Sequence, residues 1–569
     1  MQPVKLDALL FLQQSDINAY CRNPSALRGL KPIFLDPGLA EEAVRRGLDA
    51  TEFDYRPLPV GRHFQARAAS EAMCRAMAID HALTAERARL FGDGIFTGWD
   101  HVPLRFFFLR ALVSRQLGEV CETHFPEGAI GLLRPRKPQQ FYFDSFVNTD
   151  AFCGGRERWR IAGHYDEVTN WVPNATSACF DFPWLAEQAA AGRVHALVHL
   201  PTVYAHLSHY AAQISQRFPL ITDLPSPFWD VPLDPKRRPL LPLQDLPKGW
   251  ADDRCATYRE RATRILDAAL AELLPHPDSR RMQVELMAQQ CHLQAVNFLG
   301  LSSALKGTRP HFIVTEHDTG AVGPLFSVAE RLGSAITVLP HSSYPTQPLP
   351  HSVRVTAVER DGFASPVRTL WGARVDSRPI RLTPRSQAPD RGQVGTVCML
   401  LNTLASRGIS YIDLAGLANF QQGLAQLCQR YKVRLLVRMK PGAACLPVAA
   451  GAFGVDARLL QEWMELPLGQ VAEASDLCIS YGELTSGAID FLEAGSYVMH
   501  VSEELRPNDL VNSSNLSTLR TMPSLPGQEA IAWIERMLAD GSHYTVQLQH
   551  QKREFSARLT AADGTLFAG

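Results

Sequence analysis

The feature that most constrains the fold is a regular alternation of short apolar runs with amphipathic stretches over residues 311–501. His311–Thr315 and Ala335–Leu339 are two such runs. The stretch from Gly323 to Arg331 between them is typical of a helix, and Gly333 follows it in the position of a C-cap. A strand, a helix and a strand in this order predict a parallel pair with a right-handed crossover.

The same alternation resumes after a polar, proline-containing stretch, residues 376–393, which we expect to link two lobes. Alternating strands and helices predict doubly wound parallel sheets, whose ligands bind beyond the carboxyl ends of the strands. The further predicted strands are Val353–Val358, Val367–Trp371, Val394–Leu401, Val433–Val437, Leu477–Ile479 and Tyr497–Val501, and the further helices are Tyr411–Arg430 and Thr485–Glu493. The chemistry is therefore expected in the loops that follow Thr315, Leu339, Leu401, Val437 and Ile479.

The N-terminal part adds further α/β material. The first 60 residues read as strand, helix and strand, and residues 223–250 are too rich in proline for a regular element. With 569 residues the chain exceeds a single core, which stops growing at roughly 250–300 residues. We predict an N-terminal α/β region over residues 1–250, the Rossmann-like remainder of an N-terminal lobe over 251–380, and a C-terminal domain over 390–569.

Composition excludes several classes of protein. The net charge of −1 argues against a duplex-binding protein. Two short segments are nevertheless basic, Arg134–Lys137 and Lys236–Arg238. They are either solvated loops or contacts for an anionic lipid or acceptor. Eleven cysteines without a C-x-x-C pair indicate reduced thiols and no zinc site. The apolar run Ala8–Leu12 is too short for a signal peptide. We expect a cytoplasmic protein, with contact at the inner face of a membrane left open.

Three loops of the second lobe predict a phosphate site. Cations and the free N–H groups of a helix start both attract phosphate, while a nearby glycine permits close approach of the backbone. An ordinary Ser/Thr helix cap is the alternative for the third loop. The candidate residues are Asn402, Ser406 and Arg407 in the first loop, Arg438, Lys440 and Pro441 in the second, and Ser480, Glu483, Thr485, Ser486 and Gly487 in the third.

This second lobe resembles the donor domain of GT-B glycosyltransferases, above all bacterial capsule and lipopolysaccharide enzymes that use CMP-activated sialic acid or Kdo (3-deoxy-octulosonate). Lys440-Pro441 and Thr485-Ser486 match two motifs of those enzymes, although histidine is commoner at the position of Lys440. The resemblance covers residues 394–510 well and 311–372 in part. It implies two Rossmann-like domains that face a central cleft, with residues 390–569 binding the nucleotide sugar and residues 1–250 on the acceptor side.

The reaction centre is expected at the strand ends of the first lobe. Asp318 is the first candidate for general base or nucleophile, and Glu316 is the second. His341 follows the neighbouring strand with Ser342 and Ser343, where it would orient the donor or carry a proton. The alternatives are helix caps and a metal-binding carboxylate pair, but the family generally works without a divalent ion, so no metal and no cofactor are predicted.

The resemblance and these residues together predict an enzyme that transfers Kdo or a nonulosonic acid from a CMP donor to a glycan or glycolipid acceptor of the bacterial surface. The second hypothesis is a polyol-phosphate transferase or a nucleotide-sugar epimerase with the same fold. The third is a non-catalytic nucleotide-binding scaffold.

Overall fold

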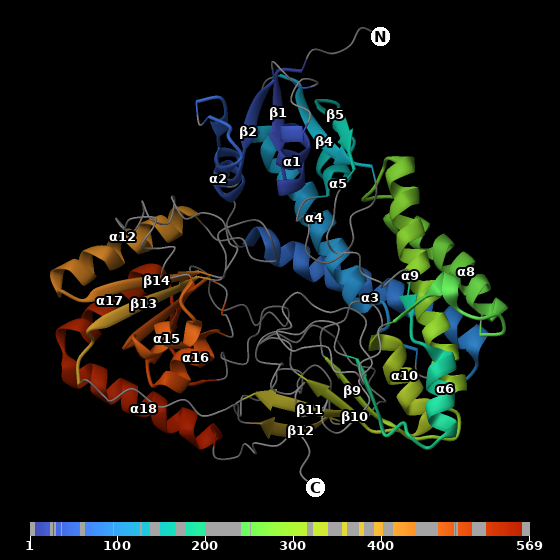
Figure 1. The fold of residues 1–569 in the computed structure, drawn as a ribbon. Coiled ribbons are helices and arrows are strands. Elements are labelled where there is room, and N and C mark those ends of the chain that lie inside the picture. The colour runs from blue at the N-terminus through green and yellow to red at the C-terminus, as the bar shows by residue number, and fades with distance from the viewer. Residues whose placement is uncertain are drawn as a thin grey trace.

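The computed structural model is an α/β protein with three parallel sheets, which lie in separate regions of the molecule (Figure 1). The residues it describes are 6–22, 27, 30–35, 37–49, 51–56, 63–94, 96–125, 128–136, 148–166, 178–199, 240–250, 252–315, 322–339, 355–360, 375–380, 392–401, 414–439, 465–482, 484, 487–502 and 519–559. The predicted α/β class with Rossmann-like parallel sheets is confirmed. The domain boundaries stay predictions.

The N-terminal sheet has the strand order β3-β2-β1-β4-β5, and all its pairs are parallel. Chain order reverses between β1 and β4, which is the switch point of a doubly wound sheet. Its strands are β1 (Ala8–Phe11), β2 (Lys31–Phe34), β3 (Asp54–Tyr55), β4 (Ile130–Pro135) and β5 (Trp159–Tyr165), and its helices are α1 (Gln14–Arg22), α2 (Pro37–Arg45), α4 (His101–His124) and α5 (Thr149–Cys153). The long helix α3 (His63–Phe91) lies between β3 and β4 in the chain but packs along α4, away from this sheet (Figure 1). The predicted extra α/β material is therefore a complete Rossmann-like unit.

The central sheet runs β12-β11-β10-β9-β7, again parallel, in one unbroken chain order. Its strands are β7 (Ala196–His199), β9 (His311–Thr315), β10 (Ile336–Leu339), β11 (Val355–Arg360) and β12 (Val375–Ile380). The helices around it are α6 (Phe182–Ala190), α8 (Asp253–Leu270), α9 (Pro277–Ala304) and α10 (Val322–Leu332). Strands β9 and β10 and helix α10 lie where the sequence predicts them, and Gly333 has the left-handed φ of 63° expected of a C-cap.

The C-terminal sheet has the order β14-β13-β15-β16-β17, so its switch point lies between β13 and β15. Its strands are β13 (Thr396–Leu401), β14 (Arg434–Met439), β15 (Leu477–Tyr481), β16 (Tyr497–Val501) and β17 (Ser524–Leu525). Its helices are α12 (Leu414–Arg430), α15 (Leu468–Glu473), α16 (Gly487–Ala494), α17 (Gly527–Ala539) and α18 (Gly541–Leu559). A hydrophobic core that extends from Val394 to Phe555 belongs to this sheet.

Two expectations are wrong. The predicted linker 376–393 begins inside β12, because an edge strand needs only one apolar face and therefore tolerates the polar residues and proline of Val375–Ile380. The proline-rich connector ends in regular structure: β8 (Leu241–Pro242) pairs antiparallel with β6 (Ala178–Cys179), and a 3-10 turn (Leu243–Asp245) follows. The predicted strand 367–371 lies outside the described residues.

The thiols of the described part of the chain are as the sequence predicts: its ten cysteines form no disulfide, and seven of them are buried. Phe107 and Phe108 of α4 are also fully buried. None of the helices in this part is both long and apolar enough to span a membrane.

A buried carboxyl group closes the first strand–helix turn of the N-terminal sheet. Asp16 is 1% exposed, and its Oδ2 accepts hydrogen bonds from the backbone N–H groups of Leu12 (2.9 Å) and Gln13 (3.2 Å). The Tyr165 hydroxyl donates to Oδ1 at 3.0 Å. Burial outweighs these bonds and raises the pKa of Asp16 from 3.8 to about 7. The turn that binds phosphate in other Rossmann-like units is thus occupied by the protein's own side chain.

This carboxyl group predicts a pH dependence of stability. Between pH 4 and 7 the folded state keeps a proton that the unfolded state has lost, so the free energy of unfolding falls as pH rises. Over this range the fall is on the order of a few kcal/mol. The melting temperature of Asp16→Asn, measured against pH, should therefore not show this decline in stability. Asp49→Asn is the control, because hydrogen bonds from Thr51 lower the pKa of this exposed carboxyl group. A wild-type decline that persists in Asp16→Asn would contradict the assignment.

Candidate functional site

The carboxyl edge of the C-terminal sheet brings polar side chains into one row. Parallel pairing aligns Arg438 of β14 with Leu400 of β13, Leu400 with Ser480 of β15, Ser480 with His500 of β16, and His500 with Ser524 of β17. Aligned residues of parallel strands point to the same face. The row, here called the edge row, lies near the carboxyl ends of these strands and crosses the switch point. Arg438 and Ser480 stand on either side of β13.

Arg438 is the cation of the edge row. The residue is only 6% exposed, so its guanidinium lies largely out of contact with water. Burial lowers its pKa, and the neighbouring Cys398 thiol opposes that change. Even so, a guanidinium stays charged at physiological pH. The sequence predicted Arg438 and Ser480 in loops at this edge, but β14 extends to Met439 and β15 to Tyr481, so each of the two residues lies within its strand, one position before the end.

Ser480 is the second predicted residue that the structure describes. Its side chain is fully buried, and its Oγ has no hydrogen-bond partner among the described residues. The next residue, Tyr481, points to the opposite face and packs against Phe420 of α12, with ring centroids 5.2 Å apart. An unsatisfied buried hydroxyl is costly, so its presence at a switch point suits a polar ligand.

His500 is a member of the edge row that sequence reasoning missed. Its Nε2 donates to the carbonyl oxygen of Gly482 at 2.5 Å, and its Nδ1 lies 2.7 Å from the hydroxyl of Ser524. Gly482 has a left-handed φ of 77° and donates its N–H to Val501. The imidazole therefore fixes the point at which the chain leaves β15 toward α16. A histidine within an otherwise apolar strand was the available signal.

The start of α16 is the third part of the predicted phosphate site. Gly487 is the first residue of this helix, as the predicted anion-binding role requires. Asp490 lies in the first turn and is 8% exposed, so a carboxylate already contributes negative charge near that helix end. The buried Arg438 guanidinium therefore supports an anion site more strongly than the dipole of α16 does.

The remaining predicted residues lie outside the described part of the chain. In the C-terminal domain these are Asn402, Ser406, Arg407, Lys440, Pro441, Glu483, Thr485 and Ser486; near the central sheet they are Glu316, Asp318, His341, Ser342 and Ser343. The strands that precede the second group are described: Thr315 and Leu339 are paired in register at the ends of β9 and β10. The segments that carry Asp318 and His341 therefore leave the sheet from neighbouring points on one edge.

The described histidines near the central sheet do not form a metal centre. His199 ends β7, is fully buried and lies with its ring centroid 5.3 Å from that of Phe180. No group of three or more His, Cys, Asp or Glu side chains in the described ranges is arranged to hold a metal ion.

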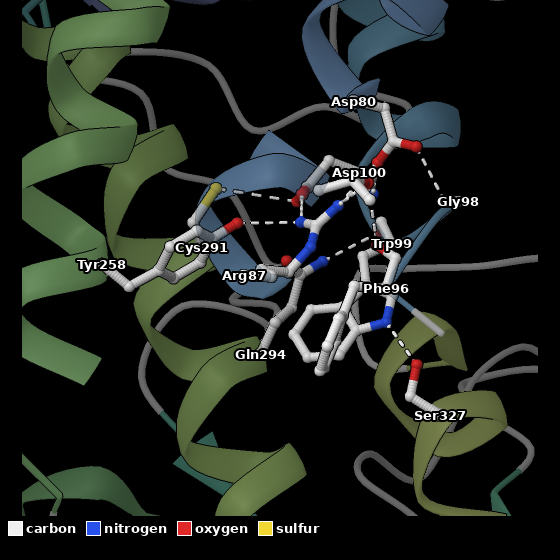
Figure 2. A network of polar contacts seen from close by, with 11 residues as sticks. Asp80, Arg87, Phe96, Gly98, Trp99, Asp100, Tyr258, Cys291, Gln294 and Ser327 are labelled. Atoms are coloured by element: carbon white, nitrogen blue, oxygen red, sulfur yellow. Dashed lines mark hydrogen bonds and ion pairs between the residues drawn. The ribbon is translucent and has the colours of Figure 1, made fainter. Parts of the chain in front are cut away.

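A buried polar network, also unforeseen from the sequence, lies between α3, α4, α8 and α9 (Figure 2). The Arg87 guanidinium is fully buried and binds the carboxylates of Asp80 (3.0 Å) and Asp100 as well as the Tyr258 hydroxyl (2.8 Å). Burial raises the pKa of Asp100, and the charge of Arg87 opposes that rise. With all its members enclosed, this network is a support for the fold rather than a ligand site.

The comparisons with known proteins add little. No protein-family model matches the chain, and no curated protein matches it. Among the solved structures that match is the crystal structure of Acinetobacter baumannii MurG, at 10% identity and a TM-score of 0.33, with 65% of this chain and 96% of that chain covered. At this TM-score the likeness says nothing about the activity of the chain.

The unsatisfied hydroxyl of Ser480 predicts an unusual response to mutation. Ser480→Ala should leave the melting temperature of the free protein unchanged or raise it, because it removes a buried group that has no partner. Ser496→Ala is the matched control: its Oγ donates to the carbonyl of Ser475 at 2.7 Å, so its loss should cost about 1–3 kcal/mol. Differential scanning fluorimetry compares the two. A clear loss of stability in Ser480→Ala would show that its hydroxyl is satisfied.

Proposed function

We propose that the chain is a glycosyltransferase whose C-terminal sheet binds the CMP part of an activated acidic sugar, Kdo first and a nonulosonic acid second. The observation that carries the proposal is the edge row, which places a buried guanidinium and an unsatisfied hydroxyl on either side of a switch point. Switch points are where open α/β sheets bind ligands, and a guanidinium binds phosphate oxygens through two parallel hydrogen bonds.

Each part of the proposed site has a chemical role. Arg438, Lys440, Thr485 and Ser486 would hold the phosphate, and Gly487 would offer its helix end. His500 acts indirectly, because its bond to Gly482 sets the backbone from which residues 483–486 start. These groups stabilise a leaving phosphate with protein donors, as metal-independent sugar transfer requires.

The reacting groups are proposed at the central sheet. Asp318 would take the proton of the acceptor hydroxyl or attack the anomeric carbon, with Glu316 and His341 assisting. The in-register ends of β9 and β10 support this grouping, because they start both segments at one edge. The acceptor is proposed to be a glycan or glycolipid of the bacterial surface, met at the inner face of the membrane.

Nucleotide binding is tested by a pair of arginines on one strand. Arg438→Gln should weaken CMP binding by about 10- to 100-fold, since a charge-assisted hydrogen bond contributes about 1.5–3 kcal/mol. Arg434→Gln is the control, because Arg434 begins the same strand, lies on the same face and is exposed. Isothermal titration calorimetry with CMP measures both. Equal affinities in the two variants would exclude Arg438 from the site.

Catalysis is tested by Asp318→Ala. We expect hydrolysis or transfer of CMP-Kdo to fall by about 10²- to 10⁴-fold, the usual contribution of a general base, while CMP binding persists. A panel of CMP-, CDP- and UDP-linked donors, assayed for release of the nucleotide, separates this reading from a polyol-phosphate transferase or an epimerase. Normal turnover by Asp318→Ala would refute the catalytic assignment.

A further inference from the structure

The N-terminal sheet has a switch point of its own, and polar side chains lie at it. Its strand order reverses between β1 and β4. Strand β1 ends at Phe11 and helix α1 begins at Gln14, so Leu12 and Gln13 form the whole turn between them. Open α/β sheets bind ligands at such points, beyond the carboxyl ends of their strands. The side chains of this turn therefore determine which ligand it can bind.

Gln13 is the residue of this turn that has hydrogen-bonding capacity left. It is 2% exposed, and its Nε2 donates to the Tyr165 hydroxyl at 2.6 Å and to Asp16 Oδ1 at 3.4 Å. The Tyr165 hydroxyl donates its own hydrogen to Asp16, so the Gln13 atom that faces it must be a donor. These bonds fix the orientation of the amide. Its Oε1 is left buried and has no hydrogen-bond partner among the described residues.

The unpartnered oxygen indicates what the missing partner must supply. An amide oxygen is only an acceptor, so its partner has to carry an O–H or N–H group. Buried polar groups without any partner are costly and rare in folded proteins. An unsatisfied acceptor that is held in one orientation at a switch point therefore suits a ligand that donates a hydrogen bond.

The same turn is unsuited to a phosphate. Asp16 Oδ2 already accepts hydrogen bonds from the backbone N–H groups of Leu12 and Gln13, which are the kind of donors that bind phosphate at the start of a helix. Burial raises the pKa of Asp16 to about 7, and within the described chain only hydrogen bonds, not a cation, oppose this rise. A phosphate would therefore meet a carboxyl group without a compensating positive charge.

The arginine near the end of β4 belongs to the other face of the sheet. Arg134 is aligned with His164 of β5, and Tyr165 is the next residue, so Arg134 and Tyr165 point to opposite faces. The Arg134 guanidinium is also paired with Asp150 at 3.0 Å. It does not supply a cation to the turn, which favours a ligand without charge.

We propose that this turn is a second ligand site, in which Gln13 Oε1 accepts a hydrogen bond from a hydroxyl group of an uncharged sugar. A sugar supplies the O–H donor that Oε1 lacks, and it brings no charge that the site would have to compensate. This site is separate from the nucleotide site of the C-terminal sheet, and the inference does not depend on sugar transfer.

Hydrogen–deuterium exchange of the whole protein tests the site. The probes are glucose, galactose and N-acetylglucosamine, with inorganic phosphate as the charged comparison, at a pH above 7, where Asp16 is ionised. We expect at least one sugar to slow exchange of the peptide that covers residues 8–17, and phosphate to leave it unchanged. Protection by phosphate would overturn the proposal. Protection by none of the sugars would also overturn it, since Oε1 would then bind water only.

A matched pair of glutamines tests the role of the oxygen. Gln116 of α4 also has a buried Oε1 without a partner, but it lies in the middle of a helix and not at a strand end. We expect Gln13→Leu to weaken sugar binding by about 2- to 10-fold, the contribution of one neutral hydrogen bond, and Gln116→Leu to leave it unchanged. Equal affinities in the two variants would exclude Gln13 from the site. The exchange experiment on the wild-type protein decides the proposal even if Gln13→Leu does not fold.

Discussion

The in-register parallel pairing of the C-terminal sheet is the constraint on which the proposed nucleotide site depends. It places Arg438, Ser480 and His500 at one level, near the carboxyl edge and across the reversal of strand order. A slip of one residue in any strand would turn its member of the row to the opposite face. Strands β13, β15 and β16 are buried along their whole length, so close packing of their side chains opposes such a slip. The positions of these three side chains therefore depend on the packing of the sheet interior, which fixes the strand register.

The molecule uses buried charge in two different ways. At the C-terminal sheet Arg438 lies across β13 from Ser480, whose hydroxyl has no partner in the described residues and can therefore bind a polar ligand. In the N-terminal part Arg87 is surrounded by carboxylates, a phenol and an indole, so its hydrogen-bonding capacity is largely used within the fold. The N-terminal sheet has a switch point too, but there Asp16 occupies the backbone donors that a phosphate would need. The contrast favours the C-terminal edge for the nucleotide.

The sequence predicted those parts of the fold that local patterns determine. Apolar runs with helical stretches between them predict β9, α10, β10 and β13–β16, because fully buried parallel strands need continuous apolar residues. β12 was missed because an edge strand carries no such run. Arg438 and Ser480 were found as residues at strand ends. His500, Asp16 and the polar network of Arg87 were not, since each depends on a partner distant in the chain or on burial that no local pattern records.

The most direct measurement is a map of where CMP protects the intact protein, taken by hydrogen–deuterium exchange with and without the nucleotide. We expect slower exchange at the ends of β14 and β15 and at the start of α16, with no change at the turn that Asp16 closes. Protection at the switch point of the N-terminal sheet instead, or nowhere along the carboxyl edge of the C-terminal sheet, would contradict it.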